Sequence, residues 1–270
     1  MTLLLILKLT VTPLLVAGAS LAARRWGPRV GGILIGFPVM TGPISVFLAL
    51  EQGLPFAAEA SVGILLALIA ICSFCLAYAE ASRRWGWPGS LLVATIVFAI
   101  TSVPLSNLGL GVLGAGILAY AALVGALVAI GRPQAVASLA RVPWWDLWLR
   151  MIASGSLVAL ITMVADHLGP RLSGLAGTYP VISTVVVSFT HHQWGRNAAL
   201  AILRGMMLSL ISFVSTFIVV GLCLTEFGLV ATYTLACLAG ALTSLVVLMI
   251  DRRLAPRRPP PEAPITKTLG

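Results

Sequence analysis

Nine apolar runs restrict what this chain can fold into. Each has at least 18 residues, the length at which an apolar stretch becomes a candidate membrane-spanning helix. The runs cover approximately residues 2–20, 29–52, 56–79, 88–105, 109–131, 147–165, 171–192, 197–223 and 228–250. Backbone groups in contact with lipid must hydrogen-bond within the protein, and in apolar runs of this length an α-helix achieves this. We therefore expect an all-α, polytopic membrane protein with about nine transmembrane helices.

The composition excludes an ordinary soluble globule, since 59% of the residues are hydrophobic and only 9% are charged. The formal net charge of +9 could suggest a nucleic-acid partner. However, the basic residues are spread between the apolar runs, which is typical of loops that face an anionic membrane surface. We expect membrane lipids as partners and no nucleic acid, and a homo-oligomer stays open.

The cysteines do not form a recognisable metal or redox site. All four lie within apolar runs, and Cys72 and Cys75 form a C-x-x-C pair without a second pair at zinc-site spacing. We expect them to be small packing residues, with no metal and no cofactor. The sequence also has no phosphate loop, HExxH or GxSxG motif. No catalytic residue, and therefore no enzyme activity, is expected.

The stretch from Gly27 to Gly53 recurs 142 residues later, from Gly169 to Gly195. Without a gap, the two copies are identical at Gly27/Gly169, Pro28/Pro170, Arg29/Arg171, Gly32/Gly174, Pro38/Pro180, Val39/Val181, Phe47/Phe189 and Gly53/Gly195. Chance matching between Gly- and Ala-rich helices does not account well for shared Pro, Gly and Arg positions. The pattern predicts two four-helix repeats, 1–108 and 143–250, joined by a linker helix and cytoplasmic loop at 109–142.

Arginines and tryptophans gather at the ends of the odd-numbered runs. All seven tryptophans lie there, at positions 26, 85, 87, 144, 145, 148 and 194. The positive-inside rule then predicts an inner (cell) membrane protein with its N-terminus outside and its C-terminus in the cytoplasm. Five crossings separate the starts of the two repeats, so the second enters from the opposite face. We expect an inverted 4+1+4 repeat, followed by a disordered cytoplasmic tail at 251–270.

An aromatic-Pro pair interrupts the helix expected in each copy of the repeat. Proline lacks an N–H and displaces the carbonyl four residues earlier, and irregular backbone at mid-membrane depth must be buried or line a cavity. The two breaks, their hydroxyls and one deep cation predict a substrate site made of Gly36, Phe37, Pro38, Thr41, Ser45, Thr178, Tyr179, Pro180, Ser183 and Arg204. The alternative is a pair of proline kinks that only shape helix packing.

Three cations lie beyond the first residue of an apolar run. Lys8 and Arg150 occupy equivalent positions of the two repeats, about one turn inside their runs, and we expect both to extend to the headgroups. Arg204 lies seven residues into its helix and is the deepest unpaired cation. It could hold an anionic substrate or extend to the surface in the same way.

The pairs Phe37-Pro38 and Tyr179-Pro180 carry a resemblance. Each half resembles the small four-helix GlpM-type inner-membrane proteins, which have a Phe-Pro pair midway along the second helix. That family is associated with exopolysaccharide production, and the resemblance implies no catalytic residue. The crossing broken helices are also similar to those of inverted-repeat secondary transporters, although this sequence lacks their central Asp or Asn.

The inverted duplication and the paired breaks predict a permease or exporter of a small molecule. It would work by alternating access around a site at the middle of the membrane. The alternative is a non-transporting accessory protein of an envelope polysaccharide or lipid pathway.

Overall fold

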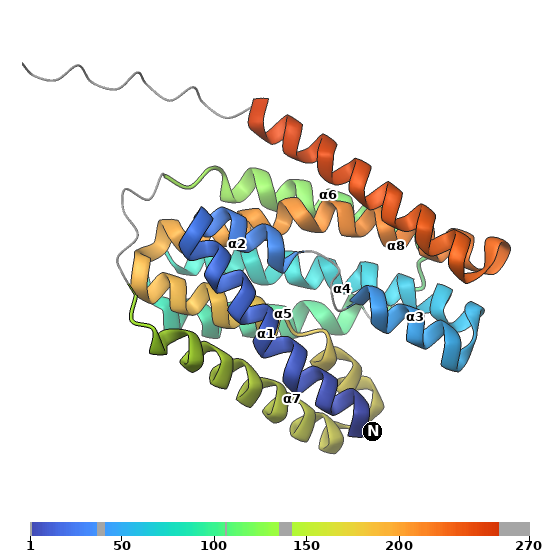
Figure 1. The fold of residues 1–270 in the computed structure, drawn as a ribbon, viewed down its shortest axis with the longest axis horizontal. Helices are drawn as coiled ribbons and strands as arrows, with labels where there is room; N and C mark the ends of the chain where they lie inside the picture. Colours follow the sequence, from blue (N-terminus) through green and yellow to red (C-terminus); the bar gives the residue numbers. More distant parts are fainter. Residues whose placement is uncertain (1, 37–40, 106, 135–141, 254–270) are drawn as a thin grey trace, which may run out of the picture.

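The computed structural model of this chain describes residues 2–36, 41–105, 107–134 and 142–253. These residues form eight helices and, within those ranges, no strand, which confirms the all-α prediction. The helices are α1 (Thr2–Trp26), α2 (Pro28–Ile35), α3 (Thr41–Gln52), α4 (Leu54–Ala81), α5 (Trp87–Leu105), α6 (Val112–Ile130), α7 (Trp145–Gly177) and α8 (Val181–Arg253). Figure 1 shows them gathered into one bundle.

Five helical stretches are long and apolar enough to cross a membrane. They are Leu54–Ala81, Trp87–Leu105, Val112–Ile130, Trp145–Met163 and Val181–Asp251. The last contains 71 residues, about three times the roughly 20 that one crossing requires. These stretches indicate a membrane location.

Two glycines divide α8 into three sections. Gly195 and Gly228 have φ angles of 79° and 70°, a backbone conformation that favours glycine and interrupts the helix. The sections, 181–194, 196–227 and 229–253, agree closely with the boundaries expected between the last three apolar runs. In Figure 1, α8 turns back at the right-hand end, and its last section (orange to red) runs back along the bundle.

Helix α2 packs against the middle section of α8 with almost no side chain between the backbones. A Cβ atom on Gly32 would collide with the carbonyl of Ile202, and one on Gly205 would collide with the carbonyl of Arg29. Gly36, four residues after Gly32, meets the same section of α8. Small residues at this spacing let membrane helices approach closely. The glycines before the first break therefore serve packing.

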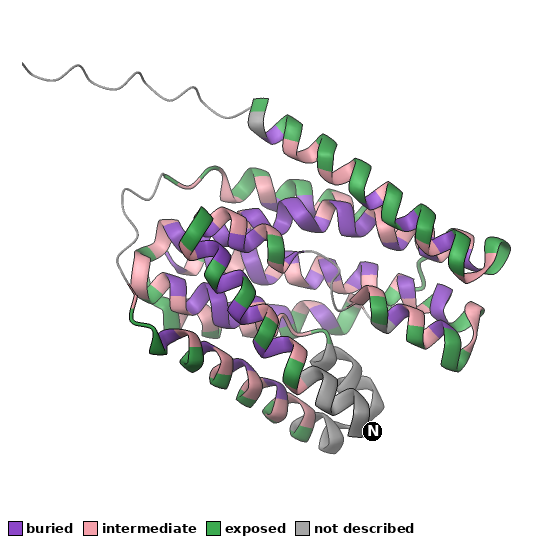
Figure 2. Cartoon of the chain, in the orientation of Figure 1, coloured by how far each residue is buried: buried purple, intermediate pink, exposed green. Residues whose placement is uncertain are grey.

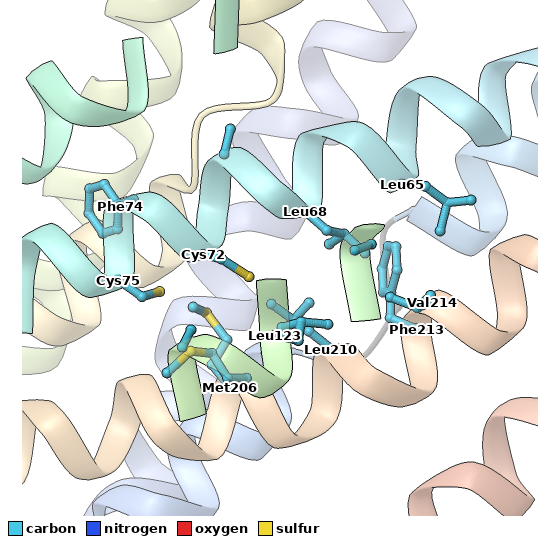
Figure 3. Packing of buried hydrophobic residues seen from close by; sticks show 14 of the residues in the cluster. Leu65, Leu68, Cys72, Phe74, Cys75, Leu123, Met206, Leu210, Phe213 and Val214 are labelled. Carbon is cyan, nitrogen blue, oxygen red and sulfur yellow. The ribbon is translucent and has the colours of Figure 1, made fainter. Parts of the chain in front are cut away.

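The buried core lies between α4, α6 and the middle section of α8. Figure 3 shows Leu68 and Cys72 of α4 facing Leu123 of α6 and Met206 and Leu210 of α8, all of them buried. Cys75 is also buried, so both members of the C-x-x-C pair pack in the core as expected. In Figure 2 the exposed residues lie mainly on the outer helices, including the last section of α8.

One hydrogen bond occurs twice at the spacing of the sequence repeat. The Ser73 and Thr101 hydroxyls are 2.7 Å apart and join α4 to α5. The Ser215 and Thr243 hydroxyls are 2.8 Å apart and join the middle and last sections of α8. Each residue of the second pair lies 142 positions after its counterpart.

Candidate functional site

The first break lies between α2, which ends at Ile35, and α3, which begins at Thr41. Phe37 and Pro38 lie outside the described residues. On the α3 side, Ser45 is buried and its hydroxyl lies 2.5 Å from that of Tyr233 in the last section of α8. This contact fixes the start of α3 against the opposite half of the chain.

The second break lies between α7 and α8, at Thr178, Tyr179 and Pro180. Thr178 is exposed, whereas the Tyr179 hydroxyl lies 2.8 Å from the Thr95 hydroxyl of α5 and accepts a 3.1 Å bond from Thr184. The Pro180 carbonyl accepts the backbone N–H of Thr184 at 2.9 Å, which is the first turn of α8. Tyr179 therefore anchors this break.

The Tyr179 ring lies among aromatic side chains. Phe74 and Phe98 contact it edge to face, with centroids 6.1 and 5.5 Å away. Edge-to-face contacts of this kind favour a fixed ring orientation. The second break is thus held by both polar and aromatic contacts.

Met206, in the middle section of α8, brings the two breaks together. The Ser183 hydroxyl, just after the second break, donates to the Met206 sulfur at 2.9 Å. Gly36, just before the residues of the first break, lies so close that a Cβ there would be 2.5 Å from the Met206 carbonyl oxygen. The described parts of the two interrupted segments therefore meet at one residue, which sequence reasoning did not identify.

The cavity near the contacts of Gly36 and Ser183 with Met206 is small. It is lined by Ile33, Leu208, Ser209, Ser244 and Leu248, and it has a volume of about 10 Å³. That is room for about one water molecule. A larger cavity of about 170 Å³ lies between the C-terminal ends of α4 and α6 and the beginning of the middle section of α8. Glu80, Arg83 and Arg196 are among the residues that line it.

Arg204 is not the unpaired cation that the sequence suggests. Its guanidinium donates to the carbonyls of Leu127 and Gly131 at 3.1 and 2.6 Å, and it caps the C-terminus of α6. It also forms an ion pair with Asp251 at 3.1 Å. The sequence did not reveal this partner because Asp251 lies in the next section of α8, 47 residues further along the chain.

Asp251 forms ion pairs with three arginines from different parts of the fold. Arg204 is joined by Arg29, which forms an ion pair with the carboxylate, and by Arg132, at 3.5 Å. Arg132 also donates to the Asp251 backbone carbonyl at 3.1 Å. We call these four residues the Asp251 cluster. Three positive charges and one negative charge leave it with a formal excess of two positive charges.

A second group of charges surrounds Arg150, which is 1% exposed. Its guanidinium donates to Asp146 at 2.8 Å, to Gln193 at 2.6 Å and to Ser20 at 3.4 Å. Arg24 also pairs with Asp146, and Gln193 donates to it. We call these five residues the Arg150 cluster. It ties α1, α7 and the first section of α8 together.

The burial of Arg150 corrects the expectation that this side chain extends to the headgroups. Its guanidinium carbon lies 5.0 Å from the centroid of the Phe189 ring, as in a cation–π contact. Asp146, one helical turn earlier, supplies the countercharge that makes burial tolerable. The spacing Asp146-x-x-x-Arg150 is a signal that could have identified the pair.

Among the described residues, no group of three or more His, Cys, Asp or Glu side chains could hold a metal ion. The resemblance to GlpM-type proteins and to inverted-repeat transporters stays a prediction. Comparison with protein-family models, with curated proteins and with solved structures finds no match for this chain.

Proposed function

We propose that this chain is an integral membrane permease or exporter of a small molecule, which works by alternating access around the two interrupted helices. The observation that carries the proposal is the contact of Gly36 and Ser183 with the same residue, Met206. A substrate at this point would be held by segments from both halves of the chain. Thr41 and Ser45 on one side and Thr178 and Ser183 on the other supply hydroxyls, as a polar substrate requires.

The proposal includes nine crossings. Helices α2 and α3 form one interrupted crossing, and the end of α7 forms another with the first section of α8. The two remaining sections of α8 supply two more crossings, and α1, α4, α5, α6 and the first part of α7 supply five.

The proposal also includes an inverted 4+1+4 repeat. The recurrence of the Ser73–Thr101 bond at Ser215–Thr243 supports it. Gly53 and Gly195, which match in the sequence repeat, both have positive φ and both separate one helix from the next. Because an odd number of crossings separates the start of the first repeat from the start of the second, the two repeats have opposite orientations in the membrane.

In the proposed orientation, both charged clusters face the cytoplasmic side. The Arg150 cluster joins three helices there, and it acts as a gate that keeps this side closed. Opening towards the cytoplasm separates α1 from α7, which breaks the contact between Arg24 and Asp146. The cavity of about 10 Å³ that described residues line near the breaks fits a closed conformation, and it fits a non-transporting accessory protein equally well.

Cysteine accessibility distinguishes these two functions without knowledge of the substrate. The four native cysteines are first replaced, and Ser183→Cys is introduced. A membrane-impermeant thiol reagent is then applied from each face of oriented vesicles. Alternating access predicts labelling from both faces. Ser102→Cys is the matched control, because Ser102 is equally buried but hydrogen-bonds only within α5.

We expect Ser102→Cys to react from neither face. If Ser183→Cys also reacts from neither face, while the variant is folded and inserted, the transport proposal fails. The accessory function is then favoured.

A further inference from the structure

We propose that the Asp251 cluster binds the phosphate of an anionic phospholipid at the membrane surface. This inference requires a membrane protein, but it does not depend on transport. Asp251 ends the last apolar stretch suited to crossing a membrane, Val181–Asp251. The cluster therefore lies at the depth where lipid headgroups begin.

The charge of the cluster fits an anionic phosphate. Three guanidinium groups surround one carboxylate, so two positive charges are left over. The planar guanidinium fork matches phosphate oxygens better than an ammonium group does. Basic groups between membrane helices on the cytoplasmic side are a recurrent feature of headgroup sites.

The side chains of the Asp251 cluster differ in how far they are exposed. The Asp251 side chain is only 7% exposed, whereas those of Arg132 and Arg29 are 32% and 43% exposed. The Asp251 carboxylate thus lies beneath the protein surface, whereas Arg29 and Arg132 reach the surface, where a headgroup can contact them. The Arg150 cluster is different, since its central arginine is fully enclosed and cannot reach a lipid.

The arginines are held in place before any ligand arrives. Asp251 pairs with all three, and the Leu127 and Gly131 carbonyls hold Arg204 as well. Groups that are already ordered lose less conformational freedom on binding. Asp251 is therefore a positioning residue in this site, and Arg29 and Arg132 make the contact with phosphate.

Apolar side chains beside the cluster favour a lipid over a soluble phosphate. Met249 and Ile250 directly precede Asp251 and are exposed, and Val128, two residues before the end of α6, is also exposed. A soluble anion makes no use of these side chains. An acyl chain can lie along them while its phosphate contacts the arginines.

The test compares lipid binding by the full chain and by Arg29→Gln/Arg132→Gln. Native mass spectrometry gives the ratio of bound phosphatidylglycerol to bound phosphatidylcholine in a neutral detergent. We expect this ratio to fall about twenty-five-fold in the double variant, because each arginine contact with the anionic headgroup contributes about fivefold. Arg84→Gln removes an exposed arginine outside the cluster, and we expect it to bind like the unaltered chain.

Asp251→Asn separates a lipid site from a purely structural cluster. It removes the negative charge, while the amide oxygen can still accept hydrogen bonds from the arginines and position them. The preference for phosphatidylglycerol should therefore stay or increase even where the protein melts earlier. A loss of that preference equal to the loss in the double variant would overturn the proposal. If the double variant does not fold, Arg132→Gln alone is used, with an expected loss of about fivefold.

Glycerol phosphate distinguishes a lipid from a soluble anion. If millimolar glycerol phosphate displaces phosphatidylglycerol and stabilises the protein without lipid, the site takes a soluble phosphate and the lipid assignment is wrong. An unchanged lipid ratio in the double variant would also overturn it.

Discussion

Asp146 and Arg150 form an ion pair at 2.8 Å inside the helix bundle, with side chains 3% and 1% exposed. Both lie at the start of α7, where the carboxylate also faces the positive end of the helix dipole. Arg24 and Gln193 complete the polar surroundings of Asp146. The pair lies within α7, and its contacts with Arg24 and Gln193 connect this helix to α1 and to the first section of α8.

Removing one partner of this pair should destabilise the protein strongly. Asp146→Asn leaves Arg150 buried without its countercharge, and such losses typically cost about 3–5 kcal/mol. The measurement is the unfolding of the detergent-solubilised protein. Glu80→Gln is the matched control, since the Glu80–Arg83 pair is 69% and 60% exposed and contributes about 1 kcal/mol at most. Equal, small losses in both variants would contradict a buried ion pair.

The sequence predicted where helices begin and end better than it predicted which charged residues form ion pairs. Gly195 and Gly228 end sections of α8 close to the expected positions, because polar and glycine-rich stretches between apolar runs are local signals. The partners of Arg29 and Arg204 were missed because Asp251 lies 222 and 47 residues away from them. Such pairs depend on how helices pack. The meeting of Gly36 and Ser183 at Met206 is likewise a tertiary contact with no local pattern.

Gly32→Ala should weaken the packing of α2 against α8. The new methyl group would collide with the carbonyl of Ile202, a backbone atom that cannot rotate away. Overpacking of this kind typically costs about 1–3 kcal/mol. Gly125→Ala is the control, because a Cβ at Gly125 of α6 meets nothing within 4 Å. It should be neutral or stabilising by up to about 1 kcal/mol. Comparable melting temperatures for the two variants would argue against the close helix contact.

Thr101→Val and Thr243→Val should have similar effects on stability. Each removes one hydroxyl from a bond that occurs in both halves of the chain, and valine keeps the shape. Ser73 keeps its bond to the Ala70 carbonyl, and Ser215 keeps its contact with the Tyr120 hydroxyl. We therefore expect losses of only about 0.6 kcal/mol in each variant. A large loss in one variant and none in the other would count against equivalent repeats.

Reporter fusions test the proposed orientation. Fusions at Gly53 and Gly228 should report outside. Those at Arg84, Gln134 and Arg258 should report the cytoplasm, because arginines are concentrated at the ends of the odd-numbered apolar runs. The readout is the activity of a reporter that works on only one side of the membrane. A cytoplasmic signal at Gly53 together with an external signal at Arg84 would reverse the orientation.

Pro180→Ala and Pro38→Ala test whether the two breaks form a substrate site. Alanine restores a backbone N–H and lets each helix close, so stability should hold or rise by about 1 kcal/mol at most. Uptake of a panel of labelled small molecules into proteoliposomes should nevertheless fall sharply, and to a similar degree, in both variants. Ser183→Ala, which removes the hydroxyl bonded to Met206, should raise the apparent KM.

Ser102→Ala is the control for this series, because it removes an equally buried hydroxyl that bonds only to the Phe98 carbonyl of its own helix. Its uptake should equal that of the unaltered chain. Melting temperatures are measured for every variant, so that a loss of uptake is separated from a loss of fold. Full uptake by the double variant Pro38→Ala/Pro180→Ala would assign both prolines to helix packing, since a site that needs the open backbone cannot survive closure of both helices.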